Sequence, residues 1–311
     1  MHAVVPVRLG CCPEGERCRL CAPAGAPPTP ELVEALVAAV RAESPDRPLR
    51  VRFFGGPPPP DALLEAAAGL PVDVRVRPDL LDRAAAERLR SWKVEGIELD
   101  ALTFHTPSLR AMRRRYPGPR LITMLEALAG VRRGLVLALG LPGQDHAISL
   151  EDARLAVGRT ETVRLHPVLV VKRSALWESH VEGLYEPLTL GQTVTTLRAM
   201  LDLLEPAGVE VIRVGQQAGP DGLGRAVAGP RHPSLRELVE ARRTLDRLRD
   251  RLRDARPAGV LTIRCAAVDE TRTRGPFNDN VRALRAEFGL EEVVVLPDPT
   301  LERGEFVLEA S

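Results

Sequence analysis

The amino-acid sequence predicts a barrel-like α/β fold, in which parallel strands alternate with helices. Short runs rich in aliphatic and β-branched residues alternate with helical patterns along nearly the whole chain. This alternation is typical of βα units around a parallel sheet. The chain has 311 residues, 44% of them hydrophobic. A barrel of about 250 residues therefore fits within it as one domain.

The strands and helices expected for the barrel follow one another in chain order. The apolar runs predict strands at residues 4–9, 49–54, 72–76, 96–99, 135–139 and 162–166. Helical patterns lie between them at residues 31–42, 60–68, 83–92, 121–131 and 150–157. A longer helix at 190–204 and a strand at 209–214 come next, so the pattern predicts six βα units followed by a further strand.

The last part of the chain predicts a small α/β extension. A charged helix is expected at residues 233–255, where leucines recur at a spacing that forms one apolar face. A strand at 260–264, a helix at 277–288 and a strand at 292–296 follow. We therefore expect a core over residues 1–215 and an extension over residues 216–311 that packs on it.

Composition and charge exclude several classes of function. The 43 basic and 42 acidic residues leave a formal net charge of +1, so no global field favours nucleic acid or an anionic membrane. The longest apolar run, at 135–139, is far shorter than the roughly 18 residues that span a bilayer. Arg8 and the cysteines after it interrupt any secretory signal. We expect a cytoplasmic protein without a membrane partner.

The strongest chemical signal is a group of cysteines near the N-terminus. Cys12, Cys18 and Cys21 follow the first expected strand with the spacing C-x5-C-x2-C, and Cys11 precedes them. A disulfide framework is not expected in a chain of this length. Thiolates are the ligands of iron–sulfur clusters. Three ligands would leave one iron of a four-iron cluster open, and the spacing also permits Cys11 as the first ligand.

A structural zinc site is the alternative for these cysteines. The C-x-x-C turn alone would favour zinc, but the second half of a zinc motif is missing. The one other cysteine, Cys265, falls inside an expected strand, and no pair of histidines has ligand spacing. The iron–sulfur interpretation is therefore preferred, with Cys265 expected in the core.

The order of motifs resembles the radical S-adenosylmethionine (SAM) family, in particular the branch of the radical SAM domain of the Elongator catalytic subunit and its bacterial stand-alone relatives. The cysteine loop after Gly10 is similar to the cluster loop of that family, and Gly55-Gly56-Pro57 to its Gly-Gly motif. The other similar segments are Arg77-Pro78-Asp79 and residues 94–99, 140–143, 163–172, 183–188 and 228–233.

The resemblance implies a fold, two cofactors and a reaction. The fold would be a partial (β/α)6 TIM-like barrel with a 4Fe-4S cluster on Cys12, Cys18 and Cys21. An enzyme of this family receives an electron from a reductant such as flavodoxin or ferredoxin and cleaves SAM reductively. The resulting 5'-deoxyadenosyl radical would act on an unknown substrate, either RNA or a small molecule.

Residues that would bind SAM are named partly by the resemblance and partly by their chemistry. Gly55, Gly56 and Pro57 match the motif whose backbone meets the methionine amino group. Glu98 lies in an expected strand, where an inward carboxylate needs a cation or hydrogen-bond partner. Arg164 ends the sixth strand, and its guanidinium suits a carboxylate. Lys172 is one of two lysines in this arginine-rich chain. The alternative interpretation is that these residues are ordinary turn and surface residues that bind no ligand.

The sequence departs from the family pattern at two places, of which the second, at residues 100–103, suggests another hypothesis. Leu20 stands where relatives have an aromatic residue, and residues 100–103 read Asp-Ala-Leu-Thr where relatives continue Gly-Val-Gln-Ser. The second hypothesis is a catalytically decayed radical SAM fold that binds metal or RNA. Acetyl transfer to tRNA, by contrast, is not expected, because residues 216–311 are too few for the acetyltransferase domain of Elongator. His166 and His232 are interpreted as structural histidines.

Overall fold

The computed structural model describes residues 2–10, 19–20, 27–216, 223–255 and 257–310. The chain divides into two compact units, Met1–Pro233 and Ser234–Ser311, which are treated separately below. The predicted cluster ligands Cys12, Cys18 and Cys21, together with Cys11, lie outside the described residues.

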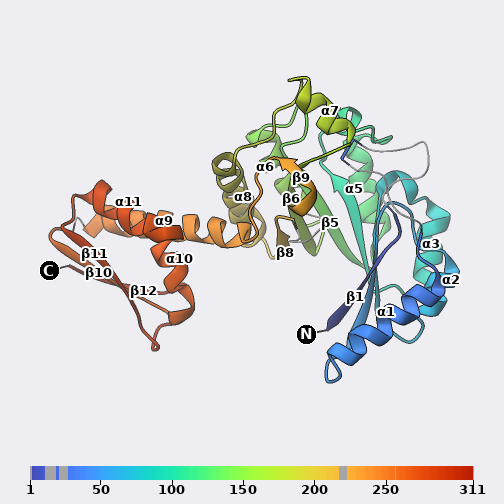
Figure 1. Ribbon diagram of the computed structural model, residues 1–311, viewed down its shortest axis with the longest axis horizontal. Helices are drawn as coiled ribbons and strands as arrows, with labels where there is room; N and C mark the ends of the chain where they lie inside the picture. The colour runs from blue at the N-terminus through green and yellow to red at the C-terminus, as the bar shows by residue number, and fades with distance from the viewer. Residues whose placement is uncertain (1, 11–18, 21–26, 217–222, 256, 311) are drawn as a thin grey trace. The chain divides into compact units, whose positions relative to one another are not determined.

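The first unit is built on a seven-stranded sheet in the order β1-β2-β3-β4-β5-β6-β8, and all of its strand pairs are parallel (Figure 1). Sheet order follows chain order, so each βα unit adds its strand beside the previous one. The predicted α/β half-barrel is confirmed, and the strand expected at 209–214 joins the same sheet at its edge. The strands are β1 (Ala3–Arg8), β2 (Leu49–Phe54), β3 (Val72–Val76), β4 (Gly96–Leu102), β5 (Arg132–Leu139), β6 (Thr162–Pro167) and β8 (Glu210–Val214).

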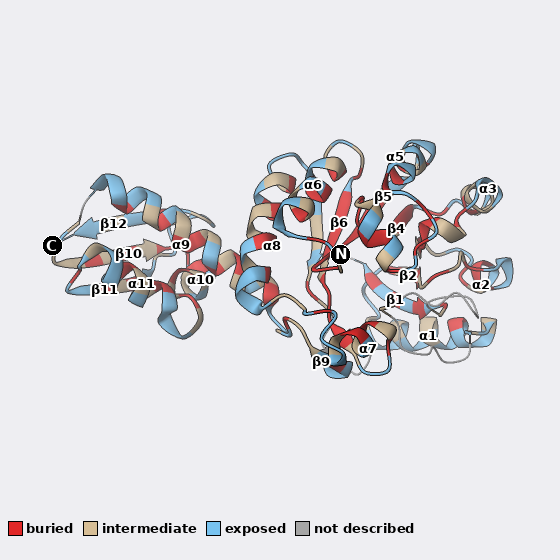
Figure 2. Cartoon of the chain, turned by 90° about the horizontal axis from the view of Figure 1, so that it is seen from above, coloured by how far each residue is buried: buried red, intermediate tan, exposed pale blue. Residues whose placement is uncertain are grey.

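Helices surround the outside of this curved sheet, as Figure 2 shows. The side chains of Val51, Phe53 and Ile97 point to that convex side and have no exposed surface. Their burial against the helices supplies the apolar core that stabilises the half-barrel. The helices of the unit are α1 (Pro30–Glu43), α2 (Asp61–Ala66), α3 (Arg83–Ser91), α4 (Thr106–Ala111), α5 (Gly118–Ala127), α6 (His146–Ala156), α7 (Ala175–Val181) and α8 (Leu190–Leu204).

The concave face of the sheet is charged. Successive side chains of a strand point to opposite faces, so the residues that alternate with the apolar core line the inside of the half-barrel. In register across the sheet, Arg52 of β2 faces Asp73 of β3, and Arg75 of β3 faces Glu98 of β4. The concave face is therefore the place where this fold gathers polar chemistry.

A small second sheet extends the first unit beyond the expected boundary. The strands β7 (Val170–Val171) and β9 (Ala226–Ala228) pair antiparallel. This pairing ties β9 to the segment after β6, so the boundary between the units lies after Pro233 and not after residue 215. The sequence did not predict these strands, because each has only two or three residues.

The second unit packs helices on a three-stranded sheet of order β11-β10-β12. The sequence predicted β10 (Val260–Cys265), β11 (Glu292–Pro297) and α9 (Leu235–Ala255), but not β12 (Phe306–Ala310) or α10 (Glu270–Arg274). With α11 (Asp279–Phe288), these elements enclose a core that includes Leu248, Leu252 and Ile263. Cys265 is a free, fully buried thiol in this core, as predicted.

No described helix in either unit combines the length and apolar character that a membrane crossing requires.

Candidate functional site

The entrance to the cysteine loop is held at the carboxyl end of β2. The Gly56 backbone amide donates a hydrogen bond of 3.1 Å to the Gly10 carbonyl oxygen. Gly55 has φ +149°, and a Cβ added there would lie 1.9 Å from the same oxygen. Only glycine permits this approach. The Gly55-Gly56-Pro57 turn predicted to meet SAM thus positions Gly10, the last described residue before the cysteines.

Arg19, one of the two described residues inside the C-x-x-C segment, contacts helices that follow β4 and β6. The Arg19 guanidinium donates to the carbonyl oxygens of Ala111 and Ala175, both at 3.4 Å, and to the Ser179 hydroxyl. The Leu176 amide donates to the Arg19 carbonyl oxygen at 3.1 Å. The ends of α4 and α7 therefore anchor this segment at the carboxyl ends of the strands, the usual location of active sites in α/β barrels.

Glu98 and Arg164 lie together in the middle of the concave face. Arg164 donates from Nε and Nη2 to both carboxylate oxygens of Glu98, at 2.9 to 3.1 Å. Arg75 binds the same carboxylate at 3.1 Å. Burial would raise the pKa of Glu98, but the charge of Arg75 and the hydrogen bonds from Arg164 outweigh it and lower this pKa to about 2. The carboxylate that Arg164 binds is therefore one supplied by the protein.

A glycine of β5 makes room for this pair. Gly134 lies between Glu98 and Thr162 in the sheet register. A Cβ at Gly134 would lie 2.7 Å from Glu98 Cγ and 2.8 Å from Thr162 Oγ1. The missing side chain lets an ion pair form across an intervening strand.

His166 follows Arg164 by two residues and shares its face of β6. Its Nε2 atom is buried and has no hydrogen-bond partner among the described residues. Burial and then the positive charges of Arg75, Arg164 and Arg213 lower the pKa of His166 to about 3. The imidazole is therefore neutral at physiological pH and able to donate or accept one hydrogen bond.

A second ion network lies at the carboxyl ends of β3 and β4. Arg77 donates to both oxygens of Asp79, with a distance of 3.0 Å from Nε. Arg114 contacts Asp79 at 3.8 Å and Asp100 at 2.9 Å. Burial opposes ionisation of Asp79, but Arg77 and Arg114 hold its pKa below the ordinary value. Asp100, where the sequence departs from the family pattern, is thus fixed by an ion pair.

A buried carboxyl holds the loops after β4 and β5 together. Asp152 accepts hydrogen bonds from the Phe104 amide at 2.7 Å and from Gln144 Nε2 at 3.0 Å. Gln144 in turn accepts a hydrogen bond from the Leu141 amide at 3.0 Å. Burial raises the pKa of Asp152 to about 6 despite these bonds. This carboxyl fixes the Gly-Leu-Pro-Gly turn that the sequence singled out.

Lys172 lies apart from the other candidates. It follows β7 and precedes Ser174, the N-terminal cap of α7. Glu98 and Arg164 lie in β4 and β6, whereas Lys172 lies in the turn between β7 and α7. Glu98 and Arg164 bind each other, and neither has a described hydrogen bond or ion pair with Lys172.

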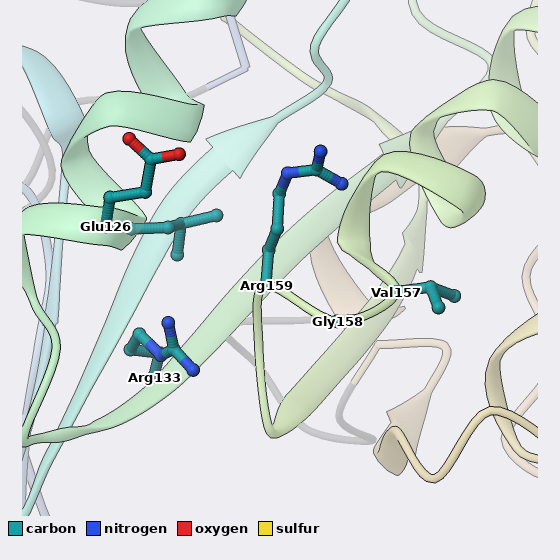
Figure 3. A pocket seen from close by; sticks show the side chains of 6 residues that line it. Glu126, Arg133, Val157, Gly158 and Arg159 are labelled. Atoms are coloured by element: carbon teal, nitrogen blue, oxygen red, sulfur yellow. The ribbon is translucent and has the colours of Figure 1, made fainter.

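A surface pocket of about 360 Å³ lies at the opposite end of the sheet (Figure 3). Its lining comes from the end of α5, the start of β5 and the turn before β6: Leu125, Glu126, Arg133, Val157, Gly158 and Arg159. Arg133 is engaged by Glu161, which binds it at 2.5 Å. Because this pocket adjoins the amino ends of the strands, it is not part of the candidate site.

Sequence reasoning missed Arg75, Gly134 and Arg19, and it interpreted His166 only as structural. A signal was present in the alternation of charge and aliphatic residues along β2 and β3, which read Leu-Arg-Val-Arg-Phe-Phe and Val-Asp-Val-Arg-Val. This period-two pattern indicates that the second face of a parallel strand is polar. No group of three or more His, Cys, Asp and Glu with metal-binding geometry occurs within the described residues.

The chain is similar to known proteins in part of its sequence and in its fold. Residues 160–247 match the family described as the radical SAM C-terminal domain. The archaeal Elp3 of Methanocaldococcus infernus is 14% identical with a TM-score of 0.62, over 80% of this chain and 64% of that one. Streptococcus suis SuiB bound to S-adenosylmethionine is 12% identical with a TM-score of 0.50, over 68% of this chain and 50% of that one.

A curated relative aligns with part of the chain. It is an uncharacterized protein of Methanocaldococcus jannaschii, 25% identical over 161 residues, which are 49% of each chain. The present chain thus spans about half the length of that relative. The solved structures establish the fold of the N-terminal unit, and the family match extends from β6 into α9. The chain is thus similar to radical SAM proteins in the sequence of residues 160–247 and in the fold of its first unit.

Proposed function

We propose that this chain is a radical SAM enzyme with a 4Fe-4S cluster on Cys12, Cys18 and Cys21. When bound and reduced by a flavodoxin- or ferredoxin-like donor, this cluster would supply the electron that cleaves SAM to methionine and a 5'-deoxyadenosyl radical. A soft donor set of three thiolates fits such a cluster. The substrate is a small molecule or an RNA.

The observation that supports the proposal best is the double anchoring of the cysteine segment. Gly55 and Gly56 hold Gly10 before the segment, and Arg19 within it bonds to α4 and α7. Both anchors lie at the carboxyl end of the half-barrel, the face where barrel enzymes carry their sites. A cluster held there would face the concave interior, where Glu98, Arg164 and His166 lie.

The roles proposed for this chain's own residues follow from their contacts. Gly55, Gly56 and Pro57 would orient SAM through backbone groups near the cluster. Glu98 and Arg164 are already paired with each other, so they would lie beside SAM as a fixed polar layer and would not bind its carboxylate. Lys172 would contribute its ammonium group to SAM binding from the turn that precedes α7.

Iron and acid-labile sulfide analysis of anaerobically purified protein tests the cluster. We expect about four irons per chain, lost in Cys12→Ala, Cys18→Ala and Cys21→Ala. Cys265→Ala, in the buried core of the second unit, is the control that should keep the iron. Cys11→Ala decides which of the two adjacent cysteines is the first ligand. Zinc in place of iron, or full iron in Cys18→Ala, would contradict the proposal.

A further inference from the structure

The concave face carries more cationic groups than its carboxylates neutralise. Four arginines from four strands share this face: Arg52, Arg75, Arg164 and Arg213. Arg75 and Arg164 share the carboxylate of Glu98. Arg52 binds Asp73 at 3.0 Å, and Arg50 also binds that carboxylate at 2.8 Å. Arg50 also binds the carboxylate of Glu95 at 2.6 Å, whereas Arg75 and Arg164 have only Glu98 between them.

These guanidinium groups also have more hydrogen-bond donors than the carboxylates have acceptor sites. A guanidinium has five N–H donors, and a carboxylate accepts about four hydrogen bonds. Arg52 Nε is buried without a partner among the described residues. Arg213 lies beside Arg164 in the sheet register and forms no hydrogen bond or ion pair with any described residue. Donors remain after both carboxylates have been used.

These cations are close enough to influence one another. The positive charges of Arg75 and Arg52 add to burial in lowering the pKa of Arg164, against the effect of Glu98. The charges of Arg75, Arg164 and Arg213 all act on His166. Arg75 and Arg164 have one carboxylate between them, and the exposed Arg213 has no ion pair with a described residue. A bound anion would offset this excess of positive charge and would accept hydrogen bonds from the donors left over.

His166 adds a neutral polar atom at the same place. Its Nε2 is buried and unpartnered within the part of the chain that the structure describes. A neutral imidazole can donate to an anionic oxygen or accept from a hydroxyl beside it. Guanidinium groups recognise both carboxylate and phosphate, often in bidentate fashion. The set therefore fits an anionic group that carries several oxygens.

We propose that Arg75, Arg164, Arg213 and His166 bind a phosphate or carboxylate group of the substrate on the concave face. The substrate role rests on the proposed radical SAM function, whereas the anion site itself does not. Arg52 contributes its charge from β2. The enzyme would thus act on an anionic substrate, with the charged group held within the half-barrel beneath the cysteine segment.

Calorimetric titration of the full-length, anaerobically purified chain with pyrophosphate and with citrate tests this site at low ionic strength. Whichever of the two probes binds more tightly identifies the preferred chemistry. Arg213→Gln should weaken that binding by about tenfold or more, the loss of one charge-assisted hydrogen bond. Arg213 is exposed and has no described ion pair, so the variant should fold normally.

The matched control is Arg132→Gln. Arg132 also belongs to the sheet, but it lies at the first position of β5 and pairs with Glu210 at 2.7 Å, away from His166. It should bind the probe like wild type. Absence of binding to both probes, or an equal loss in the two variants, would overturn the proposal.

Competition experiments separate this inference from the proposed function. SAM should not displace the probe; if it does, the site belongs to the cofactor and the substrate assignment is wrong. Probe binding in a protein that forms no 5'-deoxyadenosine would contradict the proposed function and leave the anion site standing. Cleavage of SAM without probe binding would support the proposed function and contradict the anion site.

Discussion

Glu98 and Arg164 form a bidentate ion pair across an intervening strand, with Arg164 Nε 2.9 Å from Glu98 Oε2 and Nη2 3.0 Å from Oε1. Both side chains are less than a tenth exposed. The sequence suggested each residue separately as a contact for SAM. Their pairing instead makes them a rigid polar layer inside the half-barrel, with Arg75 as a third member.

Removing the charge of Glu98 should destabilise the protein strongly. Glu98→Gln leaves Arg75 and Arg164 without their carboxylate, and breaking a buried pair in this way costs about 3–5 kcal/mol of unfolding free energy. Urea denaturation at neutral pH measures the loss. Glu210→Gln is the control, because its pair with Arg132 is exposed and should contribute less than about 1 kcal/mol. Similar losses in both variants would contradict the account.

Gly134 should tolerate no side chain. In Gly134→Ala the new Cβ would overlap Glu98 Cγ and Thr162 Oγ1, so either the ion pair or the strand must shift. Such overpacking typically costs about 1–3 kcal/mol. Gly191→Ala in α8 meets nothing within 4 Å and should be neutral or slightly stabilising, because alanine favours helices. Thermal denaturation distinguishes the two, and unchanged stability in Gly134→Ala would refute the packing argument.

Asp152 should make stability depend on pH in a defined window. Its pKa rises from 3.8 to about 6 on folding, so the folded state binds the proton more tightly. Stability from this group is complete below pH 3.8, falls by about 3 kcal/mol as pH rises to 6, and is constant above that.

Asp152→Asn should remove this contribution, while Glu126→Gln on the exposed side of α5 should keep it. Urea denaturation between pH 4 and pH 7 measures the difference between each variant and wild type. If the unfolding free energy of Asp152→Asn depended on pH as steeply as that of the wild type, the pKa of Asp152 would not be the cause of the dependence.

Gly55 should matter to the cysteine segment more than to the sheet. Gly55→Ala would drive a Cβ into the Gly10 carbonyl oxygen and displace the start of that segment. We expect iron content after reconstitution to fall to less than half that of wild type, with circular dichroism unchanged. Gly191→Ala again serves as the control. Full iron content in Gly55→Ala would separate this turn from cluster binding.

The half-barrel was predictable because strand and helix periodicity are local signals. The predicted bounds of β2, β3 and α8 agree with the structure, since each is an uninterrupted run with turn residues at both ends. The short strands β7 and β9 carried no such pattern and form through their mutual pairing.

The chemistry of the concave face was harder to predict, because it depends on contacts between distant strands. Glu98 was suggested by its strand position, but its partner lies 66 residues away. Gly134 resembled an ordinary glycine at the start of an apolar run. Its role becomes evident only when β5 lies between β4 and β6.

The central claim is that the chain cleaves SAM reductively. The direct measurement is anaerobic incubation of the reconstituted full-length protein with SAM and dithionite, followed by chromatographic quantification of 5'-deoxyadenosine. We expect 5'-deoxyadenosine from the wild type and from Cys265→Ala, and none from Cys18→Ala. A wild-type protein with an intact cluster that binds no SAM and forms no 5'-deoxyadenosine would contradict the enzyme assignment and favour a decayed radical SAM fold.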